Sequence, residues 1–123
     1  MSQDIVADAL NQIMNVKKAR KTEVRIKKHS KFLINILNLM KKLGYLDYEI
    51  EDKELRVSIK DINEVKAIKP RFNVSIDKID KYVRRFLPAR GFGFIIISTN
   101  KGLLTHEEAI EEKIGGSLIA YIF

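Results

Sequence analysis

Apolar residues recur every three or four positions in two stretches of the first half of the chain, which predicts two amphipathic helices. We expect the first helix to begin after Ser2, whose hydroxyl can cap it, and to end near Ala19. The second should begin after Ser30 and stop at Gly44, because glycine is typical of helix C-termini. The buried stripes are Ile5, Ala9, Leu10, Ile13 and Met14 in the first helix, and Phe32, Leu33, Ile36, Leu37 and Met40 in the second.

Alternation of apolar and polar residues predicts strands around these helices. Val24 and Ile26 alternate with cations. Residues 46–50 and 55–59 both alternate and are joined by the run Glu-Asp-Lys-Glu, which indicates a β-hairpin. The first part of the chain should therefore follow the order α-β-α-β-β.

The middle of the chain predicts a change of structure near Pro70. Residues 61–69 are polar and form either a linker or a short strand, and residues 72–76 alternate as in a strand. Asp77 should cap a short helix that ends at Pro88.

The last third predicts a core strand, a capped helix and a terminal strand. The core strand should cover residues 92–97. Thr105 and Glu108 have the spacing of a capping box, which predicts a helix from His106 to Lys113. A glycine pair at 115–116 should break that helix before a strand over residues 118–123.

These elements predict an α+β fold of two small packed lobes. The chain has 123 residues, which suits such an arrangement. We expect an N-terminal α-β-α-β-β lobe over residues 1–64 and a mainly β C-terminal lobe with short helices over residues 65–123.

The charge pattern predicts a polyanionic partner. The formal net charge is +7, and the cations gather in two segments, 17–42 and 66–101, that acidic stretches separate. This favours one positive face, and nucleic acid is the commonest polyanion that such a face binds. The alternative is a soluble basic surface without a partner.

Side chains suited to catalysis or metal binding are scarce. Cysteine is absent, which excludes disulfides and thiolate metal sites and favours a reducing compartment. His29 lies among cations, and His106 is interpreted as a surface residue beside a solvated acidic face of glutamates. No glycine-rich phosphate loop, transmembrane run or signal peptide is found. We therefore expect no enzyme, metal, cofactor, small-molecule substrate or membrane partner.

Residues 90–94, Arg-Gly-Phe-Gly-Phe, match the opening of the RNP1 motif of RNA-recognition motifs. That motif stacks bases on exposed aromatics, but its last aromatic and its partner motif are missing here. We expect Phe92 and Phe94 to be core residues, while Gly91 and Gly93 serve a turn and close packing. A single-stranded RNA binder of this type is kept as the alternative, beside a small enzyme or a protein-interaction module.

The strand over residues 92–97 ends at two hydroxyls, an amide, a cation and a glycine, which together are called the tip: Ser98, Thr99, Asn100, Lys101 and Gly102. Such groups can bind sugar hydroxyls, base edges and phosphate, and glycine allows a left-handed turn. The other interpretation is a surface turn whose hydroxyls bond their own backbone. The residues by themselves leave these two interpretations near even.

The tip lies in a segment that resembles the signature of the eighth small-subunit ribosomal protein family, archaeal and eukaryotic type. Residues 97–109, Ile-Ser-Thr-Asn-Lys-Gly-Leu-Leu-Thr-His-Glu-Glu-Ala, are followed by the glycine pair and an apolar terminal strand, as in that family. The likeness extends over the chain: residues 4–24 resemble the family's first helix and strand, 30–46 its second helix, 68–76 its central strand and 87–94 its archaeal and eukaryotic branch.

The resemblance implies a structural protein of the cytoplasmic small ribosomal subunit. It implies primary binding to a helix in the central domain of small-subunit ribosomal RNA, a role in subunit assembly, and neighbouring small-subunit ribosomal proteins as further partners. The tip would make the strongest RNA contact. The resemblance implies secondary RNA contacts from Asn15, Lys17, Lys18, Arg20, Lys21, Lys69 and Arg71.

Overall fold

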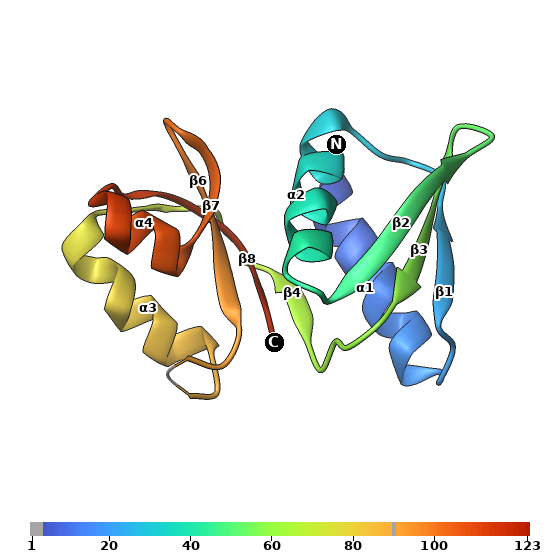
Figure 1. The fold of residues 1–123 in the computed structure, drawn as a ribbon, viewed down its shortest axis with the longest axis horizontal. Coiled ribbons are helices and arrows are strands. Elements are labelled where there is room, and N and C mark those ends of the chain that lie inside the picture. Colours follow the sequence, from blue (N-terminus) through green and yellow to red (C-terminus); the bar gives the residue numbers. More distant parts are fainter. Residues whose placement is uncertain (1–3, 90) are drawn as a thin grey trace. The chain divides into compact units, whose positions relative to one another are not determined.

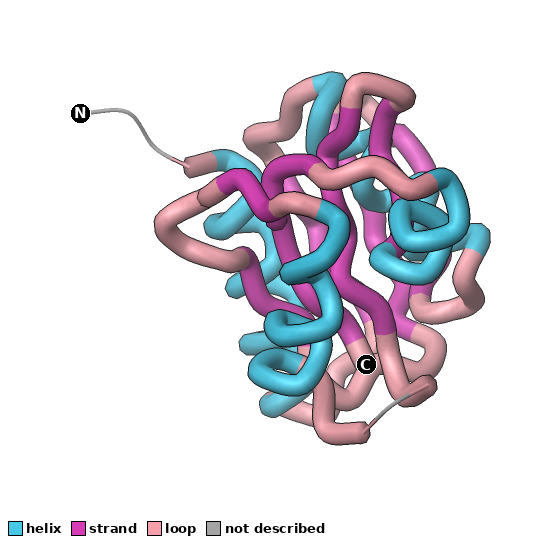
Figure 2. The backbone as a smooth tube through the Cα atoms, turned by 90° about the vertical axis from the view of Figure 1, so that its left-hand side faces the viewer, coloured by secondary structure: helices cyan, strands magenta, loops and turns pink. Residues whose placement is uncertain are grey.

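The computed structural model describes residues 4–89 and 91–123, which form two compact units that meet in the sequence at Val65 and Lys66. Both units combine helices with a β-sheet (Figure 1). Figure 2, coloured by secondary structure, shows the same mixture of helices and strands. The predicted α+β class is therefore confirmed.

The first unit begins with the two predicted helices. Helix α1 covers Ile5–Lys18, and the carboxylate of Asp4 caps it by accepting a hydrogen bond from the Ala7 amide at 3.1 Å. The expected cap Ser2 lies outside the described residues, and Asp4 takes that role. Helix α2 covers Lys31–Lys42, and its predicted cap, Ser30, accepts a hydrogen bond from the Leu33 amide at 3.2 Å.

A three-stranded sheet completes the first unit. Strands β1 (Glu23–Ile26), β2 (Leu46–Glu51) and β3 (Glu54–Ile59) pair antiparallel in the order β1-β3-β2. Asp52 and Lys53 form the predicted hairpin turn with φ of 49° and 67°, the left-handed values of a type I′ turn. The fully buried side chains of this unit come from both helices and the sheet: Leu10, Ile13, Ile26, Leu33, Ile36, Leu37, Met40, Leu46, Leu55 and Val57.

The second sheet has the strand order β4-β8-β6-β7, with β5 also pairing with β8. Its strands are β4 (Val65–Ala67), β5 (Asn73–Val74), β6 (Phe94–Thr99), β7 (Gly102–Thr105) and β8 (Gly116–Ile122). Helices α3 (Ile79–Phe86) and α4 (His106–Glu112) accompany it. Segment 61–69 thus contains a short strand, one of the two predicted forms.

The core of the second unit fixes the middle of β6. Ile95 and Ile97 are fully buried and belong to one apolar cluster with Val83 of α3, Ala109 of α4 and Leu118 of β8. Because side chains alternate along a strand, Ser98 lies on the opposite face of β6 from Ile97. The tip therefore begins where the buried part of β6 ends, as the sequence predicts.

Two local predictions in the second unit are wrong, and one strand was missed. Asp77 does not cap α3, because a 3₁₀ turn over Ile76–Lys78 comes first and the Asp77 carboxylate bonds the Ser75 side chain. The core strand begins at Phe94, since Gly93 takes φ of +95° and interrupts extended backbone. Strand β7 was not predicted at all.

The glycine pair has a different role from the one predicted. Helix α4 ends before it, because Lys113 already adopts left-handed backbone with φ of 58°. Instead, both glycines lie where two segments of the chain approach each other closely. A Cβ at Gly115 would come within 2.2 Å of the Val74 carbonyl oxygen, and one at Gly116 within 2.3 Å of the Ser98 carbonyl oxygen. Only glycine leaves room for these contacts.

Candidate nucleic-acid interface

The tip is the turn of the hairpin formed by β6 and β7. Thr99 pairs with Gly102, so Asn100 and Lys101 occupy the turn between them. Gly102 takes φ of +100°, a backbone conformation that side chains disfavour, and a Cβ there would have no heavy atom within 4 Å. The predicted left-handed glycine is confirmed, and its backbone conformation, not crowding, is the reason.

Hydrogen bonds of Thr99 hold the turn together. Its hydroxyl donates to the Gly102 carbonyl oxygen at 2.8 Å and accepts from the Lys101 amide at 3.1 Å. A hydroxyl has one donor and two acceptor positions, so one acceptor position of Thr99 is left for a ligand. For this residue the structure favours the interpretation as a self-bonded turn, whose conformation is fixed by bonds within the chain.

Lys101 has an intramolecular partner that the sequence did not indicate. Its ammonium lies 3.1 Å from a carboxylate oxygen of Glu112 in α4, and both side chains are about half exposed, at 58% and 51%. Exposed ion pairs of this kind contribute ~0.2–1 kcal/mol. A phosphate can therefore displace Glu112 at little cost.

A polar row extends the tip across the sheet. Ser98 of β6 and Asn73 of β5 are both paired with Ser117 of β8, so the three residues lie side by side on neighbouring strands. Directly paired residues point to the same face, and Ser98 and Asn73 are separated by two strand spacings, about 10 Å. Sequence reasoning did not assign Asn73 or Ser117, because their alignment exists only once the strands pair.

Helix α4 is fixed behind the hairpin by two predicted side chains. Thr105 accepts a hydrogen bond from the Glu108 amide at 3.2 Å, and the Glu108 carboxylate accepts one from the Thr105 amide at 3.2 Å. The predicted capping box is confirmed. It anchors the end of β7, and with it the returning strand of the tip.

His106 is buried, contrary to the surface position predicted. Its side chain is 5% exposed, and its Nδ1 accepts a hydrogen bond from the Ile95 amide at 3.1 Å. Burial lowers the pKa of His106, and Glu107 and Asp80 oppose this shift more weakly. The lowered pKa favours the neutral imidazole, whose Nδ1 connects the start of α4 to β6.

The secondary candidates lie in two places. Asn15, Lys17 and Lys18 are in the last turns of α1, and Arg20 and Lys21 follow at the turn to β1. Lys69 and Arg71 flank Pro70 between β4 and β5, at exposed positions. Only the second group belongs to the unit that carries the tip, and Arg71 is two residues from Asn73 of the polar row.

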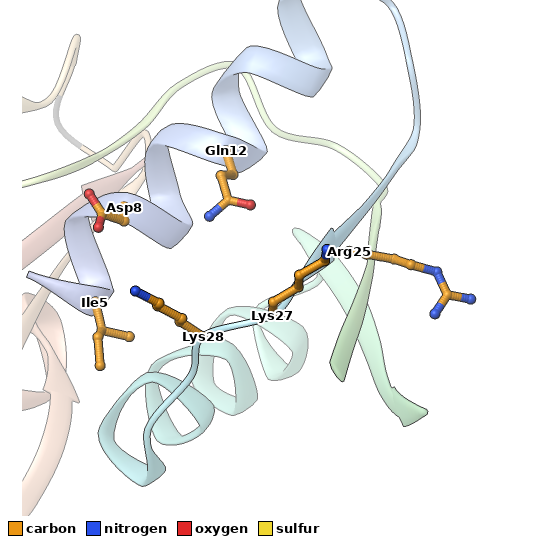
Figure 3. Close-up of a pocket in the computed structure, with 6 residues that line it drawn as sticks. All are labelled: Ile5, Asp8, Gln12, Arg25, Lys27 and Lys28. Carbon is orange, nitrogen blue, oxygen red and sulfur yellow. The ribbon is translucent and has the colours of Figure 1, made fainter. Parts of the chain in front are cut away.

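A small basic pocket lies between α1 and β1 (Figure 3). It measures about 260 Å³ and is lined by Asp8 and Gln12 of α1 and by Arg25, Lys27 and Lys28 from β1 and the loop after it. In Figure 3 the Lys28 side chain extends toward the start of α1, whereas Arg25 points away. Sequence reasoning counted these cations in the basic segment 17–42 without assigning them a site.

The RNP1-like run does not form a stacking platform on the strand. Phe92 precedes β6, is 50% exposed, and its ring lies 6.2 Å from that of Phe123, so the expectation of a core position is wrong. Phe94 is half-buried against the His106 ring, at 6.1 Å. Arg90 lies outside the described residues. Gly91 and Gly93 both have positive φ, and Gly93 also packs closely on Phe123, as predicted.

Other chemistry finds little support in residues 4–89 and 91–123. This part of the chain has no group of three or more histidine, aspartate or glutamate side chains placed to hold a metal ion. His29 donates from Nε2 to the Lys53 carbonyl oxygen at 2.9 Å and so serves the hairpin turn. No helix in the same residues is long and apolar enough to cross a membrane.

Comparison with known proteins identifies related chains. Residues 4–123 match the model of a family described as ribosomal protein S8. The small ribosomal subunit protein uS8 of Nanoarchaeum equitans (strain Kin4-M) is 41% identical over 129 residues, and the match covers 100% of both chains. The similarity thus includes both units.

Proposed function

Because the chain belongs to the ribosomal protein S8 family, we propose that it is a structural protein of the small ribosomal subunit that binds ribosomal RNA as a primary binder. Its RNA site would be a helix in the central domain of small-subunit ribosomal RNA, and its binding would support assembly of the subunit in the cytoplasm. Neighbouring small-subunit ribosomal proteins would be its other partners. Its role would be binding, without catalysis.

The observation that carries this proposal is the preformed tip with its polar row. Thr99 and Gly102 set the turn before RNA arrives, so little conformational entropy is lost when RNA binds. Ser98, Asn100 and Asn73 then offer a hydroxyl and two amides that can bond 2′-hydroxyls and base edges. These groups would supply the selective part of the binding.

The cations of both units would supply the unselective part. Lys17, Lys18, Lys69 and Arg71 would neutralise phosphates, and each neutralised phosphate steepens the salt dependence of binding. Lys101 would join them after it leaves Glu112. Selectivity and salt dependence would therefore come from different residues, which allows them to be tested separately.

The test is footprinting of small-subunit ribosomal RNA with and without the protein, followed by affinity measurements on the protected helix over a range of salt concentrations. Ser98→Ala with Asn100→Ala should weaken binding of that helix about 10- to 100-fold, as expected for two lost hydrogen bonds, with the salt slope unchanged. Thr99 is left intact because its hydroxyl holds the turn.

The matched control is Lys17→Ala with Lys18→Ala. This variant should weaken binding to all RNAs and reduce the salt slope, while the preference for the protected helix remains. The proposed roles are wrong if the tip variant loses salt slope but keeps its preference. The proposal as a whole fails if no helix of the central domain is protected.

A further inference from the structure

A row of aromatic rings crosses the second unit from the segment before β5, over α3, to the C-terminal strand. The ring centroids of Phe72 and Tyr82 are 5.0 Å apart, those of Tyr82 and Phe86 6.4 Å, those of Phe86 and Tyr121 5.5 Å, and those of Tyr121 and Phe123 6.1 Å. From Tyr82 to Phe123 successive rings are nearly parallel, within 11° to 19°. At these separations parallel rings are offset, and all five are half-buried.

A groove of about 480 Å³ opens beside this row. Three aromatic side chains line it, Phe72, Phe86 and Tyr121, together with three cations, Lys66, Lys69 and Arg85. Among the residues that the structure describes, no carboxylate lines it. The Arg85 guanidinium lies 5.3 Å from the ring centroid of Phe86, so cation and aromatic face are already in contact. The volume is in the range of sites that bind small organic groups.

The groove is separate from the tip. Tyr121 is paired with Ile95, which is four residues before Thr99 along β6, so the two surfaces are about 13 Å apart along the strand. Paired residues share a face, so Tyr121 lies on the face of Ile95, whereas the polar row lies on the face of Ser98, three residues further along the strand. Residues of the groove can thus be substituted without disturbing the tip.

We propose that this groove binds an unpaired nucleotide of RNA, with the base stacked on the aromatic rings and the phosphates beside Lys66, Lys69 and Arg85. Single-stranded RNA combines flat π faces with a negative backbone, and proteins bind it with aromatic side chains placed next to cations. The lining has that composition, and a lining that contains three cations favours a polyanion. The inference rests on the proposed RNA-binding function and adds a second, base-stacking contact to it.

The test uses the full chain and a fluorescent hexauridylate as the probe. Tyr121→Leu keeps an apolar side chain but removes the π face, and Arg85→Gln removes one cation at an exposed position on α3. Tyr121→Leu should weaken hexauridylate binding about 5- to 100-fold, the range expected for loss of one stacked base. Arg85→Gln should also weaken binding and should reduce its salt dependence, because one phosphate contact is lost. Hexauridylate carrying 5-iodouridine should cross-link to the peptides that contain Phe86 or Tyr121.

Two matched variants control for general effects. Arg84→Gln removes the neighbouring cation of α3, which does not line the groove and pairs with Asp80 at 2.8 Å. Tyr48→Leu removes a half-buried tyrosine of the first unit that also has a cation, Lys41, over its ring. Both should bind hexauridylate within about twofold of the unchanged protein, since neither Arg84 nor Tyr48 lines the groove.

The outcomes separate this inference from the proposed function. If the central-domain helix is bound normally but the groove variants bind hexauridylate as well as the controls do, the groove inference is overturned and the proposed function stands. If folded Tyr121→Leu protein cross-links at an unchanged rate, the stacking role is also overturned. Cross-linking of the groove to a ribosomal protein in assembled subunits, with no RNA cross-link, would assign the groove to a protein partner.

Discussion

Replacing His106 by phenylalanine probes how α4 is attached to β6. The imidazole is 5% exposed, and its Nδ1 accepts the Ile95 amide hydrogen at 3.1 Å. Phenylalanine keeps a planar ring of similar size but offers no acceptor. The substitution therefore leaves one amide of a fully buried strand residue without a partner.

The magnitude follows from that orphaned amide. An unsatisfied buried donor costs about 1–3 kcal/mol of folding free energy. For a domain of this size, that loss lowers the melting temperature by several degrees. His106→Asn is the informative control, because an amide oxygen can replace Nδ1 as acceptor and should restore much of the stability.

The pH dependence gives a second readout. Burial lowers the pKa of His106 in the folded protein, so the unfolded chain binds a proton first as the pH falls. The contribution of His106 to folding stability is therefore complete above the ordinary histidine pKa, near 6.5, and is lost progressively as the pH falls below that value. The pKa values of the Asp47 and Asp77 carboxyls are also lowered, by hydrogen bonds, but those contributions are lost only below about pH 4.

Urea denaturation followed by circular dichroism between pH 7.5 and pH 4.5 measures both effects. The unchanged protein should lose stability across this interval, whereas His106→Phe should be less stable at pH 7.5 and have a flatter profile. The reasoning would be refuted if the phenylalanine variant were as stable as the unchanged protein at pH 7.5. It would also be refuted if the two proteins lost stability in parallel on acidification.

Four further variants test the hairpin and its supports. Gly102→Ala should cost about 1–2 kcal/mol in urea denaturation through backbone strain alone, since the added methyl meets open space. Gly116→Ala should cost about 1–3 kcal/mol through crowding against Ser98, and it should also weaken RNA binding. Gly102→Ser is its control, because a side chain at that open position causes no crowding. Thr105→Ala should cost about 1 kcal/mol by loss of the cap, and unchanged unfolding would argue against the capping box. Lys101→Met should change stability by less than about 1 kcal/mol but reduce the salt slope of RNA binding, and an unchanged slope would remove Lys101 from the phosphate contacts.

Elements with a strong local signal could be predicted from the sequence. The apolar stripes of α1 and α2 and the cap at Ser30 depend on residues within one or two turns, and the Thr105–Glu108 box spans three positions. The tip was also located correctly, because a run of buried residues ended in consecutive polar ones. Its functional meaning came from the resemblance, since the residues by themselves left two interpretations open.

The errors concern residues whose environment is made by distant parts of the chain. His106 follows a capping threonine and precedes glutamates, which is typical of an exposed position, yet pairing of β6 with β7 carries it beneath Ile95. Phe92 is of a residue type common in protein cores. However, the positive φ of Gly93 interrupts the extended backbone, so that β6 begins only after Gly93 and Phe92 stays outside it. Strand β7 has only two apolar residues between a turn and a cap, too few for a periodic signal.

The sequence by itself determined the helices, the β2–β3 hairpin, the basic character and the polar tip, because each depends on neighbours along the chain. Only the tertiary structure decided that Asn73 and Ser117 stand level with Ser98, that Glu112 reaches Lys101, and that the aromatic row forms beside three cations. These relations join residues far apart in sequence, and strand register and helix packing set them, which no local pattern encodes.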